Sequence, residues 1–207
     1  MGYYALLKVS KNEMRIILAS KSPRRKEILE NLGLKFEIIV ADADESSDIT
    51  DPHLLVSTLA ERKGRAVADR LDSLDDTLII ASDTLVYAEG EFLGKPRDKD
   101  DARRMIKMLS GKSHIVVSGI YLCFCGKEAK GASATGVIFD EMTDAEIEHY
   151  ISSPEPYDKA GGYAVQGLAA VYINGLEGDY FNVVGLPVNL MCKMLKEEFG
   201  TNIFDLT

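Results

Sequence analysis

The chain has 207 residues, of which 46% are hydrophobic and 28% charged, an ordinary composition for one globular domain. Its formal net charge is −9, so a nucleic-acid polymer would be repelled and is not expected as a partner. No run of residues is apolar over the length needed to cross a bilayer, and no secretory signal is evident. Together these features predict a cytoplasmic protein without a membrane partner.

Apolar runs alternate with segments of helical periodicity, and this alternation predicts an α/β fold. In chain order the predicted elements are a strand at residues 15–19, a helix at 23–33, a strand at 36–40, a helix at 52–71, strands at 77–87 and 92–93, a helix at 98–109, strands at 114–124 and 133–139, a helix at 143–151, a strand at 169–173 and a helix from 187. Residues 127–132 are predicted to be irregular, and residues 174–185 are predicted to form a loop. We find no internal repeat or linker, and expect one domain at residues 14–207 after a short N-terminal extension at 1–13.

The first departure from locally favourable chemistry is the basic turn at residues 20–26. Ser22 and Pro23 predict the start of a helix there, so the turn already carries unpaired backbone N–H groups and the positive end of the helix dipole. Arg24, Arg25 and a following lysine add positive charge. A phosphate group would offset that charge and accept from the N–H groups, the serine hydroxyls and an arginine. We interpret the turn as a phosphate site; the alternative is a solvated basic turn.

Lys63 lies on the apolar face of the helix predicted from Pro52. It follows Leu59 by four residues and precedes Ala66 by three, so it shares their stripe. A lysine at such a position either extends its head to water or reaches into a cleft, where its charge would bind phosphate. The sequence leaves both interpretations open.

A polar triplet, Ser82-Asp83-Thr84, interrupts the apolar strand predicted at residues 77–87. Strand alternation places Asp83 on one face and Ser82 and Thr84 on the other. A carboxylate buried in such a strand is costly unless it is paired, hydrogen-bonded or bound to a metal ion. Asp83 is therefore a candidate general base or Mg²⁺ ligand, with a bulge or a structural hydrogen bond as the alternative.

These features belong to a set of segments that together resemble the Maf family of nucleotide pyrophosphatases. In chain order the segments are ASKSPRR at 19–25, DADES at 42–46, Lys63, ASDT at 81–84, GKP at 94–96, DKAGGYAVQG at 158–167 and NVVGLP at 182–187. The resemblance runs from about Met14 to Glu198. It is specific because the segments occur together in the family's order, whereas no single one would suffice.

The resemblance implies an elongated mixed β-sheet flanked by helices, similar to that of inosine triphosphatases, with two lobes around a nucleotide cleft. It implies hydrolysis of nucleoside triphosphates to the monophosphate and pyrophosphate, assisted by a divalent cation such as Mg²⁺ or Mn²⁺, and often a homodimer. Asp83 matches the proton acceptor proposed for the family, and Glu45 matches an acidic position near the metal.

The other implied site residues fall into two groups. The positions similar to phosphate-binding residues of the family are Ser20, Arg24, Lys63 and Lys95, with Arg25 beside them in the basic turn. The positions similar to specificity determinants of the branch acting on dTTP and UTP are Arg25, Thr84 and Gln166. A glutamine amide suits that role because its acceptor and two donors match the carbonyl and N3–H edge of thymine or uracil.

The hypothesis from the sequence is that a divalent cation, held by Glu45 or Asp83, positions the triphosphate. Arg24, Lys63 and Lys95 would then stabilise charge on the leaving pyrophosphate. Whether Asp83 acts as base or metal ligand stays open, because a bound metal would lower its basicity. Two alternative functions also remain, namely the same hydrolysis of modified nucleotides and a non-catalytic nucleotide-binding regulator of cell division.

Overall fold

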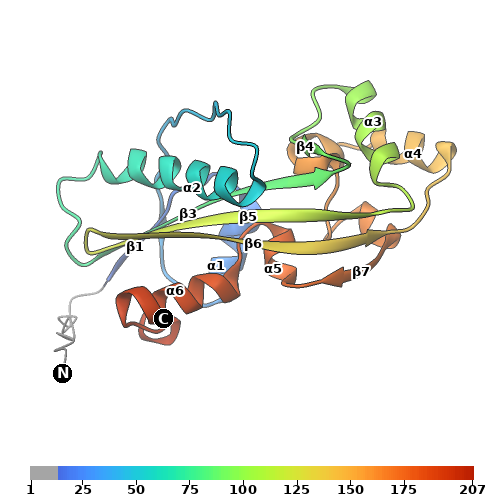
Figure 1. Ribbon diagram of the computed structural model, residues 1–207. Coiled ribbons are helices and arrows are strands. Elements are labelled where there is room, and N and C mark those ends of the chain that lie inside the picture. Colours follow the sequence, from blue (N-terminus) through green and yellow to red (C-terminus); the bar gives the residue numbers. More distant parts are fainter. Residues whose placement is uncertain (1–13) are drawn as a thin grey trace.

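The computed structural model describes residues 14–207, and the extension predicted at residues 1–13 lies outside this range. In the described part of the chain, seven strands form one mixed sheet in the order β2-β1-β3-β5-β6-β7, with β4 paired to β3 (Figure 1). The strands are β1 (Arg15–Leu18), β2 (Glu37–Ile38), β3 (Thr77–Ala88), β4 (Glu91–Leu93), β5 (Ser113–Phe124), β6 (Lys127–Phe139) and β7 (Ile173–Glu177).

Helices cover both faces of this sheet. The α-helices are α1 (Pro23–Asn31), α2 (Pro52–Ala68), α3 (Lys99–Leu109), α4 (Asp144–Ile151), α5 (Tyr180–Val184) and α6 (Val188–Phe199). Short 3-10 helices are η1 (Glu155–Asp158), η2 (Ala160–Gly162), η3 (Leu168–Tyr172) and η4 (Ile203–Asp205). Between residues 14 and 207, no helix combines the length and the apolar character that a membrane crossing requires.

Three long strands give the molecule its elongated shape (Figure 1). Strands β3 and β5 have 12 residues each and β6 has 13, which corresponds to a length of about 40 Å. They pair antiparallel with one another, whereas β1 runs parallel to β3 at one end of the sheet. The predicted fold class, an α/β fold with an elongated mixed sheet flanked by helices, is confirmed.

Alternate residues of β3 face opposite sides of the sheet and pack against different helices. Leu78 and Ile80 pack in one apolar cluster with residues of α1 and α6. Val86 and Ala88 lie on the same face, farther along the strand, and pack in a second cluster with residues of α3 and α4. Two separate cores therefore lie along one face of the sheet, and they define two lobes. Ile79 faces the other side and packs with residues of α2.

Several boundaries differ from those predicted. Strand β6 begins at Lys127 and not at residue 133, because a two-residue turn with positive φ at Cys125 and Gly126 pairs it with β5 from its first residue. Its small residues give little local strand signal, and pairing with β5 overrides that weak propensity. Strand β2 has only two residues, Glu37 and Ile38, in place of the strand predicted at 36–40.

The strand predicted at residues 169–173 is wrong. These residues lie mostly in the 3-10 helix η3, and the neighbouring strand is β7, Ile173–Glu177. The segment predicted as a loop at residues 174–185 holds most of β7 and the whole of α5. Local apolarity is insufficient to predict the structure here. The carboxylate of Glu155, distant in sequence, accepts hydrogen bonds from the backbone N–H groups of Leu168 and Ala169 and thereby supports a helical turn.

Candidate active site

The polar triplet of β3 lies where this strand has an open edge. Strand β1 stops at Leu18, which pairs with Ile80, and β4 pairs with β3 only from Val86 onward. Within the described residues, the stretch 81–85 therefore has no strand beside it on that edge. Side chains and loops from both lobes converge on this gap, as the following contacts show.

Asp83 faces the side of the sheet that α2 covers, opposite to Ser82 and Thr84, and this separation agrees with the alternation predicted for the strand. Its Oδ1 lies 2.5 Å from Nζ of Lys63, and the same Nζ lies 2.8 Å from Oε1 of Glu45. One ammonium group therefore bridges the carboxylates of a strand and of the acidic loop. The side chains of Asp83 and Lys63 are only 16% and 23% exposed, whereas that of Glu45 is 64% exposed. This geometry resolves the question about Lys63, which points into the site and not to bulk water.

Two glycines bring α2 close enough to the sheet for this contact. A Cβ atom on Gly119, the β5 residue opposite Asp83, would lie 2.2 Å from the carbonyl oxygen of Val56 in α2. A Cβ on Gly64 would lie 2.1 Å from the ring of Tyr121 in β5. Larger residues would force the helix away from the sheet.

Ser82 and Thr84 face the opposite side and hold the segment after α5. The Ser82 hydroxyl lies 2.7 Å from the carbonyl oxygen of Gly119 and 3.1 Å from that of Gly185. Thr84 Oγ1 lies 2.8 Å from Ser118 Oγ, which donates in turn to the carbonyl of Asn182 at 2.8 Å. This polar cluster separates the two apolar cores described above.

Arg25 joins the basic turn to this cluster. Its Nε donates to the carbonyl of Gly185 at 2.8 Å, Nη1 donates to Ser20 Oγ at 3.0 Å, and Nη2 donates to Thr84 Oγ1 at 3.1 Å. Burial lowers the pKa of Arg25 to about 10, while the charge of Asp83 acts in the opposite direction. All three guanidinium nitrogens are thus engaged with the protein, and Arg25 fixes the turn against β3.

The start of α1 keeps the features expected of an anion site. Ser22 is the N-cap residue, but its hydroxyl makes no capping hydrogen bond, and the first turn holds no acidic residue. Arg24 is paired with Asp158, at 3.2 Å between Nη1 and Oδ2. Asp158 belongs to η1 in the other lobe and also contacts Lys159 Nζ at 2.5 Å. The Arg24–Asp158 ion pair therefore spans the two lobes.

The remaining predicted residues differ in how far they are buried. Ser20 is buried, and its hydroxyl accepts from the backbone of Ser22 at 3.2 Å. Lys95 is exposed after β4. The pKa of Glu45 is below its usual range, first because of the hydrogen bond and charge of Lys63 and then because of the charge of Lys95. Gln166 is also exposed, in the loop between η2 and η3, and within the described residues its side chain makes no hydrogen bond to the residues around Asp83.

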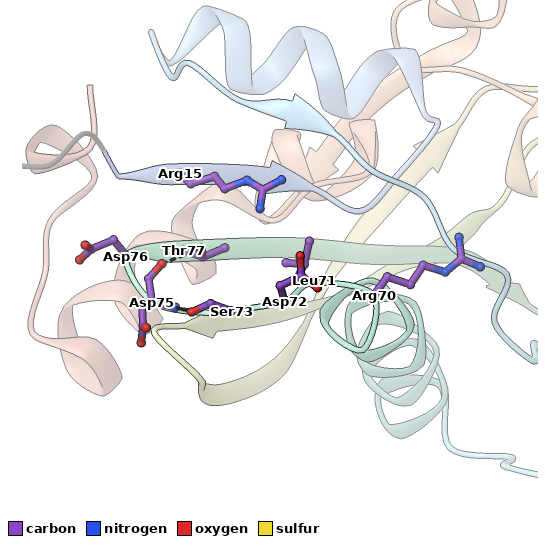
Figure 2. Close-up of a pocket in the computed structure, with 8 residues that line it drawn as sticks. All are labelled: Arg15, Arg70, Leu71, Asp72, Ser73, Asp75, Asp76 and Thr77. Carbon is purple, nitrogen blue, oxygen red and sulfur yellow. Dashed lines mark hydrogen bonds between the residues drawn. The ribbon is translucent and has the colours of Figure 1, made fainter.

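A separate depression of about 630 Å³ lies at the beginning of β3 (Figure 2). Its lining includes Arg15, Arg70, Asp72, Asp75 and Asp76. Thr77, in its lining, lies six positions before Asp83 along β3, or about 20 Å away. Three aspartates against two arginines make it unsuited to a triphosphate, and we do not assign it to the site.

The whole of this arrangement lies within a region that matches a known family. The family described as "Maf-like protein" matches residues 15–198. The chain belongs to the Maf family. The family resemblance seen in the sequence is thereby confirmed.

Relatives of this Maf chain are similar over nearly their full length. The dTTP/UTP pyrophosphatase of Alkaliphilus metalliredigens is 46% identical over 192 residues, which cover 91% of this chain and 98% of the relative. The dTTP/UTP pyrophosphatase of Chromobacterium violaceum is 46% identical over 195 residues, covering 93% and 98%. The Ham1 protein of Staphylococcus aureus shares the fold, with a TM-score of 0.50 and 13% identity over 89% of this chain and 99% of that protein.

The roles of three contributors to the Maf site were not predicted from the sequence. The carbonyl of Gly185 gathers donors from two segments, and a carbonyl has no side chain to mark it. Gly119 is needed for close approach but sits in an unremarkable strand. Asp158 is a charged residue at the head of the DKAGG segment, and its charge opposite the basic turn is the signal that could have linked it to Arg24.

Proposed function

We propose that this protein hydrolyses the α–β phosphoanhydride of nucleoside triphosphates to the monophosphate and pyrophosphate, with dTTP and UTP as preferred substrates. The observation that carries the proposal is the bridge from Asp83 through Lys63 to Glu45 at the open edge of β3. Carboxylates and lysine at one point supply both an acceptor for a water proton and positive charge for phosphate. The names of relatives 46% identical to this chain support the substrates.

The triphosphate would lie between the start of α1 and Lys63. Backbone N–H groups of the first turn and the hydroxyl of Ser20 would donate to its oxygens, because the turn is uncapped and free of acidic residues. Arg24 would exchange its ion pair with Asp158 for a phosphate oxygen. Lys63 and Lys95 would place positive charge where the leaving pyrophosphate becomes more negative.

Base selection is assigned to Gln166 and Thr84, supported by Arg25. The exposed amide of Gln166 would pair with the carbonyl and N3–H edge of thymine or uracil. Arg25 would support base selection indirectly, because its hydrogen bonds hold Thr84 and the carbonyl of Gly185 in place next to the proposed nucleotide site.

A divalent cation fits the residues present. The carboxylates of Asp83 and Glu45 already converge on one positive group, and oxygen donors suit Mg²⁺ or Mn²⁺. Among residues 14–207 no group of three His, Cys, Asp or Glu side chains forms a complete cage. Phosphate and water would complete the shell, which is usual for Mg²⁺. When bound, the cation would neutralise phosphate charge.

In the reaction, a water oxygen forms a bond to the α-phosphorus while the bond from that phosphorus to the α–β bridging oxygen breaks. The bridging oxygen leaves with the pyrophosphate and its electron pair. Asp83 orients the water and accepts its proton, since its carboxylate is the acidic group on β3 within the gap. A cation shared with Glu45 would lower the basicity of Asp83, so the two roles of this carboxylate compete. Lys63, held by Asp83 and Glu45 before substrate arrives, is released toward the leaving group.

The same proposal includes the one domain at residues 14–207 and the cytoplasmic location predicted from the sequence, and the homodimer that the family resemblance implies. Sedimentation of the purified protein would test the oligomeric state, and a monomer at all accessible concentrations would contradict it.

The test is an assay of purified protein with Mg²⁺ and a panel of nucleoside triphosphates, in which pyrophosphate and orthophosphate are measured separately. We expect pyrophosphate and monophosphate from dTTP and UTP, and a fall of at least about 100-fold in kcat for Asp83→Asn. The control is Asp140→Asn, which alters an exposed carboxylate paired with Asn174 in the other lobe.

Other outcomes would each contradict part of the proposal. Orthophosphate alone would mean that a different bond is cleaved. Tight binding without product would favour the regulator, and turnover confined to modified nucleotides would replace the substrate class. An Asp83→Asn protein with most of its activity would remove Asp83 from the chemistry.

A further inference from the structure

Glu155 holds the far end of the loop that carries Gln166. Its Oε2 accepts from the backbone N–H of Leu168 at 2.7 Å, and Oε1 accepts from that of Ala169 at 3.2 Å. The Tyr150 hydroxyl lies 3.1 Å from the same Oε1. One carboxylate thus caps the first turn of η3, which starts two residues after Gln166.

The contact with Glu155 requires a glycine at position 167. A Cβ atom at this position would lie 2.4 Å from the carboxyl carbon and from both oxygens of Glu155. Its φ of −137° is open to any residue, so the requirement for glycine comes from the carboxylate and not from backbone conformation. The glycine next to Gln166 therefore lets the chain approach a protein side chain closely.

The near end of the loop is held by the same lobe. Gly161 and Gly162 both adopt positive φ, and the Gly162 carbonyl lies 3.0 Å from the hydroxyl of buried Tyr150. Tyr150 therefore contacts both the Gly162 end of the loop and Glu155 at the other end. Gln166 lies between two fixed points while its own side chain is exposed.

We propose that Glu155 is a positioning residue for base selectivity, which acts by fixing the backbone of the Gln166 loop. This inference rests on the proposed function, because it assumes that Gln166 reads the edge of the pyrimidine. Thymine or uracil and cytosine differ at that edge by the exchange of one acceptor for a donor and of one donor for an acceptor. A hydrogen-bonding group discriminates between such partners only when its own position is held, so that the wrong partner leaves it unpaired.

The groups assigned to phosphate are not among the hydrogen-bond partners of the Glu155 carboxylate. The groups assigned to phosphate lie on α1, on α2 and after β4, whereas Glu155 contacts η3 and α4. Loss of the cap should therefore act on the choice of base and leave the handling of triphosphate nearly unchanged. A purely structural role would instead lower activity toward all bases alike.

The test is Glu155→Gln, which keeps the shape but turns one acceptor into an amide that faces a backbone N–H. The ratio of kcat/KM for dTTP to that for dCTP should fall about tenfold, with kcat/KM for dCTP changed less than about twofold. Hydrogen exchange of a peptide that contains Leu168 and Ala169 should become faster. The matched control is Glu146→Gln, whose carboxylate also accepts from a backbone N–H, that of Thr143 at 2.7 Å, in the same lobe.

Gly167→Ala provides a second, independent variant. The added methyl group would push the loop from the carboxylate, so the same loss of selectivity is expected. Because both changes break one contact, the double variant should lose little more than either single variant. Fully additive losses would overturn the proposal.

Three further results would overturn the inference. The first is an equal fall for both nucleotides in Glu155→Gln, the second is no change in the ratio, and the third is the same change in the Glu146→Gln control. A wild-type enzyme that releases pyrophosphate without preferring dTTP would overturn this inference and the proposed base preference, while the proposed hydrolysis would stand. If the wild type releases no pyrophosphate, the proposed function fails, and the ratio of affinities for non-hydrolysable dTTP and dCTP analogues still tests Glu155. A wild type that binds neither analogue would overturn both.

Discussion

Replacement of Lys63 by methionine separates the two tasks that the structure gives this side chain. In the free protein its ammonium group bridges Asp83 at 2.5 Å and Glu45 at 2.8 Å. Methionine has a similar length and suits the apolar stripe of α2, so Lys63→Met removes the charge with little change in packing. The variant leaves two facing carboxylates without their shared partner.

The size of the effect follows from exposure. Glu45 is 64% exposed, so its pair with Lys63 contributes at most about 1 kcal/mol. Asp83 and Lys63 are 16% and 23% exposed, and their pair is worth more, about 2 kcal/mol. A cation that binds both carboxylates must displace the ammonium group. Loss of Lys63 should therefore raise the affinity for Mn²⁺ in the absence of nucleotide by about 10- to 100-fold, at about 1.4 kcal/mol per tenfold.

Turnover should change in the opposite direction. Without Lys63 the leaving pyrophosphate loses one of its charge-stabilising groups, so kcat should fall by about 100- to 1,000-fold. Calorimetry or the electron paramagnetic resonance of Mn²⁺ would report affinity, and pyrophosphate release would report turnover. The control is Lys130→Met, which removes the ion pair of Lys130 with Glu61 of α2, 2.5 Å between charged atoms. Unchanged or weaker Mn²⁺ binding by Lys63→Met would refute a joint role of Asp83 and Glu45 as ligands.

Two further predictions concern the framework of the site. Gly119→Ala would press a methyl group onto the backbone of Val56 and move α2 away from Asp83. The free energy of unfolding should therefore fall by about 1–3 kcal/mol, and turnover should fall with it. Gly131→Ala, whose methyl group would meet only flexible side chains, is the control in the denaturation and activity assays. Burial lowers the pKa of His114 from its usual value of 6.5 to about 4. As pH falls, the unfolded state therefore takes up a proton before the folded state does. The stability that this histidine contributes above pH 6.5 is lost as pH falls toward 4. Between pH 7 and 4, urea denaturation should show that the wild type loses about 3 kcal/mol more than His114→Phe, and parallel losses would contradict this assignment.

Much of the site could be predicted because it violates local rules. A polar triplet inside an apolar strand marked Asp83, and strand alternation correctly separated it from Ser82 and Thr84. The stripe of α2 placed Lys63 toward the sheet, although only the structure shows that it ends on Asp83 and not in water. Glu45 lies in a loop without periodicity, so the residues alone gave it no role and only the family resemblance singled it out.

Other features were invisible because they depend on contacts distant in sequence. A glycine in a strand weakens the local signal, and nothing near Gly119 shows that a helix backbone lies against it. The carbonyl of Gly185 attracts donors through the fold and not through its own side chain. Likewise, η3 replaced a predicted strand because Glu155, 13 residues before Leu168, accepts its backbone N–H. Propensity cannot anticipate such a tertiary cap.

The triplet in β3 serves chemistry and architecture from opposite faces of one strand. Ser82 and Thr84 tie the sheet to the segment around Gly185, and their polar cluster lies between the cores of the two lobes. Among residues 14–207, Lys63 is the only hydrogen-bond partner of the Asp83 carboxylate. Neutralising Asp83 can therefore abolish chemistry while the lobes keep their connection, whereas truncating Ser82 removes one hydrogen bond from each of the carbonyls of Gly119 and Gly185. Strand periodicity thus lets adjacent residues have separate roles, structural for Ser82 and Thr84 and, as proposed, catalytic for Asp83. The gap beside β3 places all three within reach of one substrate.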